Sequence, residues 1–410
     1  MNLENKICIL INFSREIDMY HELIESIPEE KVDIIINDIK TFEKERKDNV
    51  LDIKDNLLLR NKKFKYFTKI YNKKKYKIII STGLADSLKI SFYSILRFVY
   101  GRTVGHLMDF LGISKIFFKI FNRPFNAGGK YSRIGSYAWY PEKVIAEKSI
   151  KYPTGMDLKL KYYPDESLGK NFDIFFTHSL MEENLIMKKF NNKICKIIGY
   201  PRYNQLNEKK KIIDELKNEF NFDNKKKIIF WTPTHIEYLD ESGKNFMPWL
   251  NKISQLNSEY NIIIRPHPKL IRFNRNIKTD LTEKNFFVDI KSDRKIGELF
   301  KAADLIFGDY GGTLFSAIYL EKPLVLLNMD NNCQFIKELN INLSLDIKLR
   351  NDLINFNTNV DIYELKKKLS YALNSEYEKK ILNLKKFFFG SKKDYVSSKN
   401  ISKFIQGYLN

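Results

Sequence analysis

The chain has 410 residues, of which 43% are hydrophobic and 29% are charged. It is therefore long enough for two globular domains and too apolar for a disordered protein. Seventy basic residues against 50 acidic ones give a formal net charge of +20. This excess favours an anionic partner, such as a phosphate-rich substrate, a membrane face or a nucleic acid. The lysines are spread along the chain, as an AT-rich genome would also produce.

The cysteines and the first residues indicate a protein of a reducing cytoplasm. Cys8, Cys195 and Cys333 are few, odd in number and far apart, which excludes a disulfide framework and a pair of metal ligands. Residues 1–13 have no cationic stretch ahead of a long apolar run, so we expect no signal peptide there. We expect a first β-strand there instead.

The amino-terminal part alternates apolar runs with helical spacing. Strands are predicted at residues 6–13, 32–36 and 76–80, and a helix at residues 15–27. Such alternation predicts a parallel sheet covered by helices, here one Rossmann-like half. Further strands are expected at residues 143–152, 172–176 and 193–198.

Residues 88–125 have a different character, with aromatic and aliphatic clusters punctuated by Arg97, Arg102 and Lys119. No uncharged run reaches the roughly 18 to 20 residues that span a bilayer. Basic residues beside apolar faces suit a helix lying on an anionic membrane surface, and they equally suit a helical hairpin buried in the amino-terminal core.

A second set of strands and helices follows a charged segment. A helix is expected at residues 208–219, a linker at residues 221–227 and a helix at residues 247–260. The expected strands are residues 228–231, 261–264, 286–289, 305–307 and 324–327. The sequence thus predicts an amino-terminal domain over 1–220, a second domain over 221–380, and a helical, aromatic tail over 381–410 that packs back on the first domain.

The stretch after the strand at 305–307 is a glycine turn, Asp309, Tyr310, Gly311, Gly312 and Thr313, followed by a helical pattern. Adjacent glycines let backbone N–H groups approach an anion, and the helix start adds the positive end of its dipole. We therefore predict that these five residues bind phosphate. A glycine turn between strand and helix also occurs for steric reasons alone, so neighbouring motifs must decide.

Two histidines also follow predicted strands of the second domain. His235 ends the segment Thr232–His235 (TPTH), and His267 lies in Arg265–Pro268 (RPHP). Ligands of open α/β sheets bind beyond the carboxyl ends of the strands, so these loops should converge. An imidazolium beside a pyrophosphate offsets the charge that develops on a leaving phosphate. Arg265 and Arg202 are candidate phosphate clamps, although Arg265, just inside its strand, also suits a structural role.

The sequence lacks the motifs of several other kinds of functional site. The sequence has no spaced cluster of metal ligands, no Walker lysine loop and no GxSxG elbow, which disfavours metal-dependent and serine-hydrolase chemistry. We expect no cofactor and no metal. No nucleic-acid recognition motif accompanies the positive charge.

Four segments occur in an order that resembles the CDP-glycerol glycerophosphotransferase family, which includes the teichoic-acid primases and polymerases. They are GYPR at 199–202, TPTH at 232–235, RPHP at 265–268 and the strand, glycine turn, helix and strand of 303–328. The resemblance covers mainly residues 170–340. It implies a GT-B architecture, with two Rossmann-like domains facing a cleft that holds the donor. It also implies that His267 acts on the donor pyrophosphate, that 309–313 bind its phosphates, and that the protein is peripheral to the inner membrane face.

The sequence departs from that family at two places. Gly311 and Gly312 replace a serine pair, and this change resembles the D-S-G-G segment of the UDP-N-acetylglucosamine 2-epimerases. The family's amino-terminal "HG" histidine, its base, aligns best with Thr154, and threonine is no base at neutral pH. Either Asp157 or His178 takes the role, and we favour Asp157, or the acceptor chemistry differs and the group transferred is not glycerol phosphate.

The sequence thus predicts a cytoplasmic, membrane-associated transferase. It would move a polyol phosphate or glycosyl unit from a nucleotide-activated donor, CDP-linked rather than UDP-linked, to a teichoic-acid or capsule-type polymer or a lipid-linked acceptor. The catalytic candidates are His267, His235 and Asp157. The alternatives are a UDP-sugar 2-epimerase-like enzyme and a non-catalytic nucleotide-sugar or polymer-binding protein. Transferred group, acceptor and oligomeric state stay open.

Overall fold

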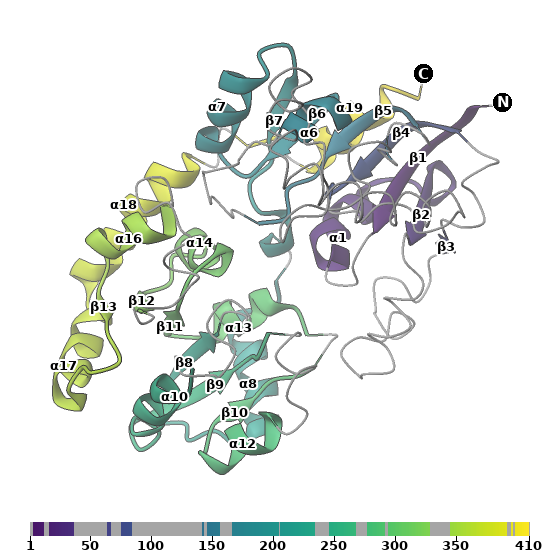
Figure 1. The fold of residues 1–410 in the computed structure, drawn as a ribbon. Coiled ribbons are helices and arrows are strands. Elements are labelled where there is room, and N and C mark those ends of the chain that lie inside the picture. The colour runs from purple at the N-terminus through teal and green to yellow at the C-terminus, as the bar shows by residue number, and fades with distance from the viewer. Residues whose placement is uncertain are drawn as a thin grey trace, which may run out of the picture.

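A computed structural model describes residues 3–11, 16–36, 64–66, 75–83, 142, 146–155, 166–204, 206–233, 246–267, 277–291, 294–328, 345–391, 395–396 and 398–409. Within these ranges the chain forms two parallel sheets with helices around them, arranged as two lobes (Figure 1). The predicted α/β class with two Rossmann-like sheets is therefore confirmed. Residues 88–125, the predicted membrane-surface segment, lie outside the described residues.

The first sheet has the strand order β3-β2-β1-β4-β5-β6-β7, and its neighbouring strands are all parallel. The strands are β1 (Leu3–Ile11), β2 (Val32–Ile36), β3 (Phe64–Tyr66), β4 (Lys75–Ser81), β5 (Ala146–Lys151), β6 (Ile174–Thr177) and β7 (Ile194–Ile197). The helical elements are α1 (Ile17–Ser26), η2 (Glu29–Lys31), α6 (Glu166–Asn171) and α7 (Leu180–Lys189). Central strands such as β4 carry runs of fully buried isoleucine, as a sheet covered on both faces requires.

The second sheet has the order β10-β9-β8-β11-β12-β13 and is also parallel. Its strands are β8 (Lys227–Thr232), β9 (Tyr260–Ile264), β10 (Phe287–Val288), β11 (Leu305–Gly308), β12 (Leu324–Leu327) and β13 (Asn355–Phe356). The accompanying helices are α8 (Lys209–Phe220), α10 (Phe246–Ser254), α12 (Ile277–Glu283), α13 (Ile296–Ala302), α14 (Gly312–Tyr319), α16 (Leu345–Asp352) and α17 (Ile362–Ala372). One apolar core joins them.

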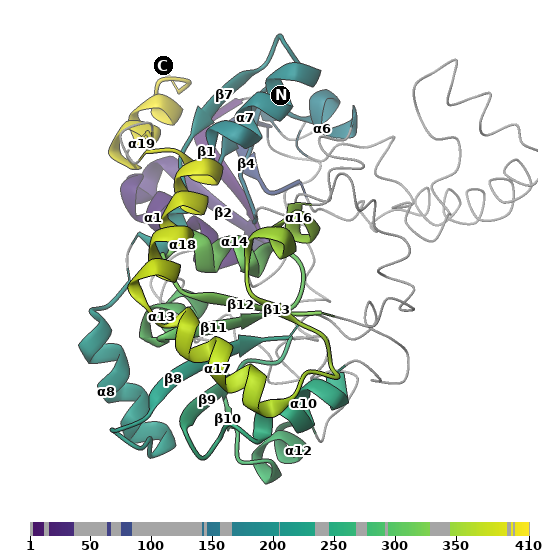
Figure 2. The same ribbon diagram turned by 90° about the vertical axis from the view of Figure 1, so that its left-hand side faces the viewer.

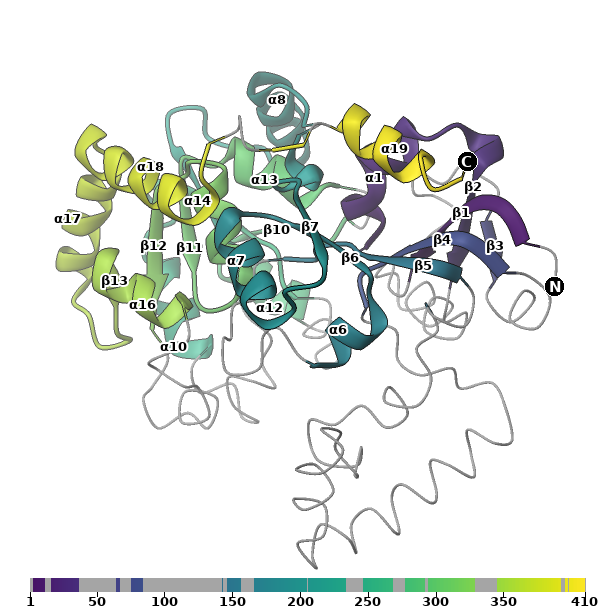
Figure 3. The same cartoon turned by 90° about the horizontal axis from the view of Figure 1, so that it is seen from above.

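The chain crosses between the lobes twice. The first crossing follows β7 and contains η4 (Pro201–Tyr203), and the second follows α18 (Ser375–Phe389) and leads to α19 (Ser398–Gln406). The residues Ile381, Phe388 and Phe389 of α18 belong to the core of the second sheet. The residues Ile401, Ile405 and Leu409 belong to the core of the first. Figures 2 and 3 show α19 beside α1, far from α17.

Tyr200 lies where the two crossings meet. Its ring centroid is 5.1 Å from that of Tyr319 on α14 and 5.7 Å from that of Phe389 on α18. The His178 ring, 4.0 Å away by centroids, contacts it from the first lobe. Gly199 precedes it with φ +67°, and a Cβ there would lie 3.1 Å from the Tyr319 hydroxyl, so only glycine suits the position.

Among the residues that the structure describes, none of the helices combines the length and the apolar character that spanning a bilayer requires.

Candidate functional site

The candidate site lies at the carboxyl edge of the second sheet, where the loops of four adjacent parallel strands begin. In sheet order these loops start at Arg265 after β9, Pro233 after β8, Asp309 after β11 and Asn328 after β12. Parallel strands place their carboxyl ends on one side, so these residues share an edge. This is the convergence that the sequence predicts for the RPHP segment and the glycine turn.

The glycine turn joins β11 to α14. Gly311 has φ +92° and ψ −165°, a conformation that residues with a Cβ rarely adopt, and the space where its Cβ would be is open. The helix α14 then begins at Gly312, and its N-cap residue, Gly311, has no side chain that could cap it. The first N–H groups of a helix have no intrahelical partner, and the helix dipole makes this end positive. The turn therefore has the geometry of an anion site.

Asp309 holds the start of this turn against the neighbouring strand. Its side chain is buried, and its Oδ1 accepts a hydrogen bond of 3.2 Å from Nε1 of Trp231 on β8. Thr232, the next residue of β8, pairs in register with Gly308. Its hydroxyl is buried and has no hydrogen-bond partner within the described part of the chain. Both strand ends therefore place polar groups beside the turn.

Arg350 is a residue at this edge that the sequence analysis missed. It comes from α16, and its guanidinium lies 3.7 Å from the centroid of the Tyr310 ring. It donates hydrogen bonds to the Asp309 carbonyl oxygen and, from Nε, to Oδ1 of Asn328 at 2.7 Å. No motif marks Arg350, which is 41 residues beyond Asp309 in the chain. Only the fold brings it to the turn.

Arg265 is occupied by contacts within the protein. Its guanidinium donates to the carbonyl oxygens of Arg294 and Lys291, each at 2.9 Å, and lies 3.3 Å from the buried carboxylate of Asp289. The Arg265 amide also bonds to the Trp231 carbonyl at 3.1 Å. These contacts fix the loop that carries the half-buried His267, which follows two residues later. A phosphate-binding role for Arg265 stays a prediction.

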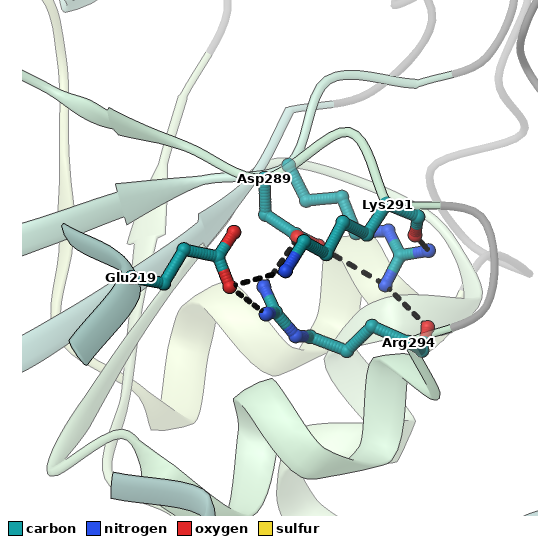
Figure 4. Close-up of polar contacts among 5 residues, drawn as sticks. Glu219, Asp289, Lys291 and Arg294 are labelled. Carbon is teal, nitrogen blue, oxygen red and sulfur yellow. Dashed lines mark hydrogen bonds and ion pairs between the residues drawn. The ribbon is translucent and has the colours of Figure 1, made fainter. Parts of the chain in front are cut away.

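Glu219 and Asp289 complete this network (Figure 4). Arg294 bonds to Asp289 at 2.6 Å and also to Glu219, which accepts a second bond of 2.8 Å from Lys291. Burial alone would raise the pKa of Glu219, but the hydrogen bonds and charges of Lys291 and Arg294 outweigh it and hold the pKa below its usual value. Burial raises the pKa of Asp289, against the opposite effect of Arg265 and Arg294. The network links α8 to the loops after β9 and β10.

The structure describes only some of the remaining candidates for catalysis. Thr154 follows β5, whereas Asp157 and His235 lie outside the described residues. His178 is 1% exposed, and its Nδ1 lies 3.1 Å from Glu182. A base must reach the acceptor hydroxyl, so the burial of His178 disfavours it for that role.

Two carboxylates that the sequence analysis did not single out lie at the end of β4. Glu16 accepts a hydrogen bond of 2.6 Å from the Thr82 hydroxyl. Glu142 accepts bonds of 2.7 Å each from Ser81 and Asn171. Both carboxylates are buried, so they fix the β4 loop in the first domain.

Arg202 belongs to the junction between the lobes. It is part of η4, and its guanidinium lies 5.9 Å from the Tyr203 ring centroid. Burial raises the pKa of Tyr152, Glu22 adds to this effect, and the positive charge of Arg202 lowers it. The charge of Arg202 therefore acts at the end of β5, and its predicted contact with phosphate stays a prediction.

In the described part of the chain, no three His, Cys, Asp or Glu side chains are grouped to hold a metal.

The sequence is similar to known proteins over its middle part. Residues 165–335 match the family model of CDP-Glycerol:Poly(glycerophosphate) glycerophosphotransferase. A teichoic acid glycerol-phosphate primase of Bacillus spizizenii strain W23 is 27% identical over 134 residues, 32% of this chain and 33% of that protein. The primase of Bacillus subtilis strain 168 is 28% identical over 173 residues, 40% of this chain and 42% of that protein. The matched region thus spans about a third to two fifths of these relatives.

Solved structures share the fold across the whole chain. The wall teichoic acid polymerase TagF superposes with a TM-score of 0.57 at 14% identity, covering 100% of this chain and 89% of TagF. The S. aureus MnaA-UDP structure gives a TM-score of 0.51 at 13% identity, covering 99% and 97%. The resemblance seen in the four motifs is confirmed: residues 165–335 match the CDP-Glycerol:Poly(glycerophosphate) glycerophosphotransferase family, and the fold is shared with TagF.

Proposed function

We propose that the chain transfers glycerol phosphate, or a related polyol phosphate, from its CDP-activated form to a teichoic-acid-type acceptor. One observation carries the proposal. The glycine turn that opens α14 has the geometry of an anion site, and it lies inside residues 165–335, the segment that matches the glycerophosphotransferase family. The related proteins are named teichoic acid glycerol-phosphate primases, which fits this donor and acceptor.

The reaction is a substitution at phosphorus. An acceptor hydroxyl attacks the phosphorus that carries glycerol, the bond from this phosphorus to the oxygen bridging to CMP breaks, and CMP leaves. The acceptor keeps the new phosphodiester, and its hydroxyl proton passes to a base. Catalysis of such a step rests on positioning and on stabilising the charge of the leaving phosphate.

The residues divide into donor-binding and catalytic roles. Residues 309–313 would hold the donor phosphates through the start of α14, and Arg202 and Arg265 would add positive charge. His267, at the end of β9, would stabilise the leaving CMP phosphate, assisted by His235. Asp157 is our candidate for the base. The donor nucleotide is a substrate, and the proposal includes no cofactor.

We propose that the protein works at the inner face of the cell membrane, through residues 88–125, where a polymer or lipid-linked acceptor is available. The basic and aromatic composition of that segment and the net charge of +20 support this placement.

A panel of nucleotides tests the donor. We would measure thermal stability with CMP, CDP-glycerol, CDP-ribitol, UDP and UDP-N-acetylglucosamine. A ligand at a hundred times its dissociation constant adds about 2.7 kcal/mol to the free energy of unfolding. The proposal predicts shifts with the cytidine compounds and CMP release from CDP-glycerol when acceptor is present.

The other outcomes are equally informative. Shifts with uridine compounds alone would favour the 2-epimerase-like alternative, which needs no acceptor. Cytidine binding without CMP release, in the presence of a teichoic-acid acceptor, would favour a non-catalytic binding protein. No shift with any nucleotide would remove the donor site altogether.

A further inference from the structure

Within the described part of the chain, Arg350 contacts Tyr310, Asp309 and Asn328 at the entrance of the glycine turn. Its guanidinium carbon lies over the Tyr310 ring, 3.7 Å from the ring centroid, one of its terminal nitrogens donates to the Asp309 carbonyl, and its Nε donates to Oδ1 of Asn328 at 2.7 Å. The side chain thereby joins the ends of β11 and β12. A planar cation with forked donors can make all three contacts at once.

These contacts fix one peptide plane. In a trans peptide the carbonyl and the following N–H point in opposite directions, so the bond to the Asp309 carbonyl also sets the direction of the Tyr310 N–H. The next residue, Tyr310, is held by the contact of its ring with the Arg350 guanidinium. Gly311 then turns the chain at φ +92° into the first residue of α14. The orientation of the amides that open the helix thus depends on the residues Arg350 holds.

Asn328 anchors Arg350 to the rest of the sheet. Its side-chain Nδ2 donates to Oδ1 of Asn355 at 2.8 Å and to Oδ1 of Asn357 at 3.1 Å. Its backbone carbonyl accepts a hydrogen bond of 2.9 Å from Nε1 of Trp249. The Asn328 side chain is therefore held by β13 and the following turn while it receives Arg350. The Nε side of the Arg350 guanidinium is therefore bonded to a side chain that is itself held in place.

We propose that Arg350 is a positioning residue that sets the glycine turn in its anion-binding conformation. The anion would be the diphosphate of the donor, an identity that rests on the proposed function. Arg350 is assigned no direct part in the chemical step. Its contribution is the shape of the turn, and a lysine, with one point of attachment and no plane to stack, cannot supply it.

The test compares Arg350→Lys and Arg350→Gln with the matched control Lys348→Gln, an exposed residue of the same helix. The first readout needs no ligand: hydrogen exchange of the amides of Leu314 and Phe315 in the first turn of α14. The second is the dissociation constant for inorganic pyrophosphate and for CDP-glycerol, followed by intrinsic tryptophan fluorescence, to which Trp231 and Trp249 contribute near the site. Where CDP-glycerol turns over, KM and kcat are measured as well.

We expect both Arg350 variants, and not the control, to speed exchange at the start of α14 by about tenfold or more, while the slow amides of β8 and β9 keep their rates. The dissociation constant for pyrophosphate and KM for the donor should rise by about tenfold or more, with kcat changed far less. A charge effect alone would let Arg350→Lys behave like the wild type, and this result would overturn the proposal.

Two further results would also overturn it: exchange that rises equally across the whole sheet, or unchanged exchange at Leu314 in both variants. Failure of the proposed function is a separate result. If the wild type binds pyrophosphate but not CDP-glycerol, the donor is wrong, and the exchange data still decide whether Arg350 positions the turn.

Discussion

The indole N–H of Trp231 and the carboxylate of Asp309 are hydrogen-bonded at 3.2 Å, which ties the end of β8 to the first residue after β11. Both residues are buried. A bond from a neutral donor to a buried carboxylate is stronger than one to a backbone carbonyl, because the acceptor is charged.

Replacement of Trp231 by Phe should therefore lower the free energy of unfolding by about 1.5–3 kcal/mol through the lost bond. Trp249→Phe is the matched comparison, since Trp249 donates to the neutral carbonyl of Asn328 and should cost about 0.5–1.5 kcal/mol for its bond. Urea unfolding measures both values. A larger loss for Trp249→Phe would show that the Asp309 bond is not the stronger one.

Gly311 and Gly312 should respond differently to alanine, although they are adjacent. Gly311 has φ +92°, so Gly311→Ala should cost about 1–3 kcal/mol in backbone strain, even though its Cβ would meet open space. Gly312 is the first residue of α14, and Gly312→Ala should change stability by less than about 1 kcal/mol. Thermal unfolding without ligand separates the two variants. Equal effects would mean that the conformation at Gly311 costs alanine little.

His267→Ala should lower kcat for transfer from CDP-glycerol by about 100-fold or more, because the leaving phosphate loses a stabilising group in the transition state. The dissociation constant for CDP-glycerol should change much less. His21→Ala is the control, since His21 lies on α1 in the first lobe beside Glu25. CMP release is the assay. A proportional loss of binding and no loss of kcat would assign His267 to donor binding instead.

Glu219 gives a pH-dependent prediction. Its pKa in the folded protein lies below its usual value, which is about 4.3 when unfolded, so its ion pairs stabilise the fold above that pH. The contribution is lost as pH falls through the folded-state pKa. The stability difference between the wild type and Glu219→Gln should thus be present at pH 7 and shrink in acid.

Urea unfolding between pH 7 and pH 3 measures this difference, with Asp214→Asn on the exposed face of the same helix as control. A difference that is constant with pH would show that Glu219 stabilises α8 by packing and not through its charge.

Most strands were predictable because central strands such as β8, β11 and β12 are runs of apolar residues that are followed by, or end at, a polar or glycine residue. The predicted segments 32–36 and 324–327 coincide with β2 and β12, and 305–307 is one residue shorter than β11. The edge strands β3 and β13 were missed because they are short and contain polar residues. The helix predicted at 247–260 ends earlier, at Ser254, where turns replace it.

The site was predictable only where its residues follow strands. The sequence placed the glycine turn and His267 at the carboxyl edge of the sheet in this way, and their roles stay predictions. Arg350 comes from α16, and Asn355 of β13 holds its partner Asn328; nothing in the local sequence of either residue marks it for this edge. Tertiary structure alone brings them there. The hydrogen bonds that Arg265 donates to the carbonyl oxygens of Lys291 and Arg294 also join residues that are distant in the sequence, so they could not be predicted from it.

The packing of α19 has a consequence for synthesis of the protein. The Ser402 hydroxyl bonds at 2.7 Å to the carbonyl of Ser26, across a separation of 376 residues, and Ile401, Ile405 and Leu409 complete the apolar core around α1. At about 5–20 residues per second, a ribosome needs roughly 20–75 seconds to make the intervening chain. The lobe that emerges first therefore waits with part of its core uncovered until the second lobe has been made. Chaperones that bind nascent apolar surfaces have their longest opportunity at α1.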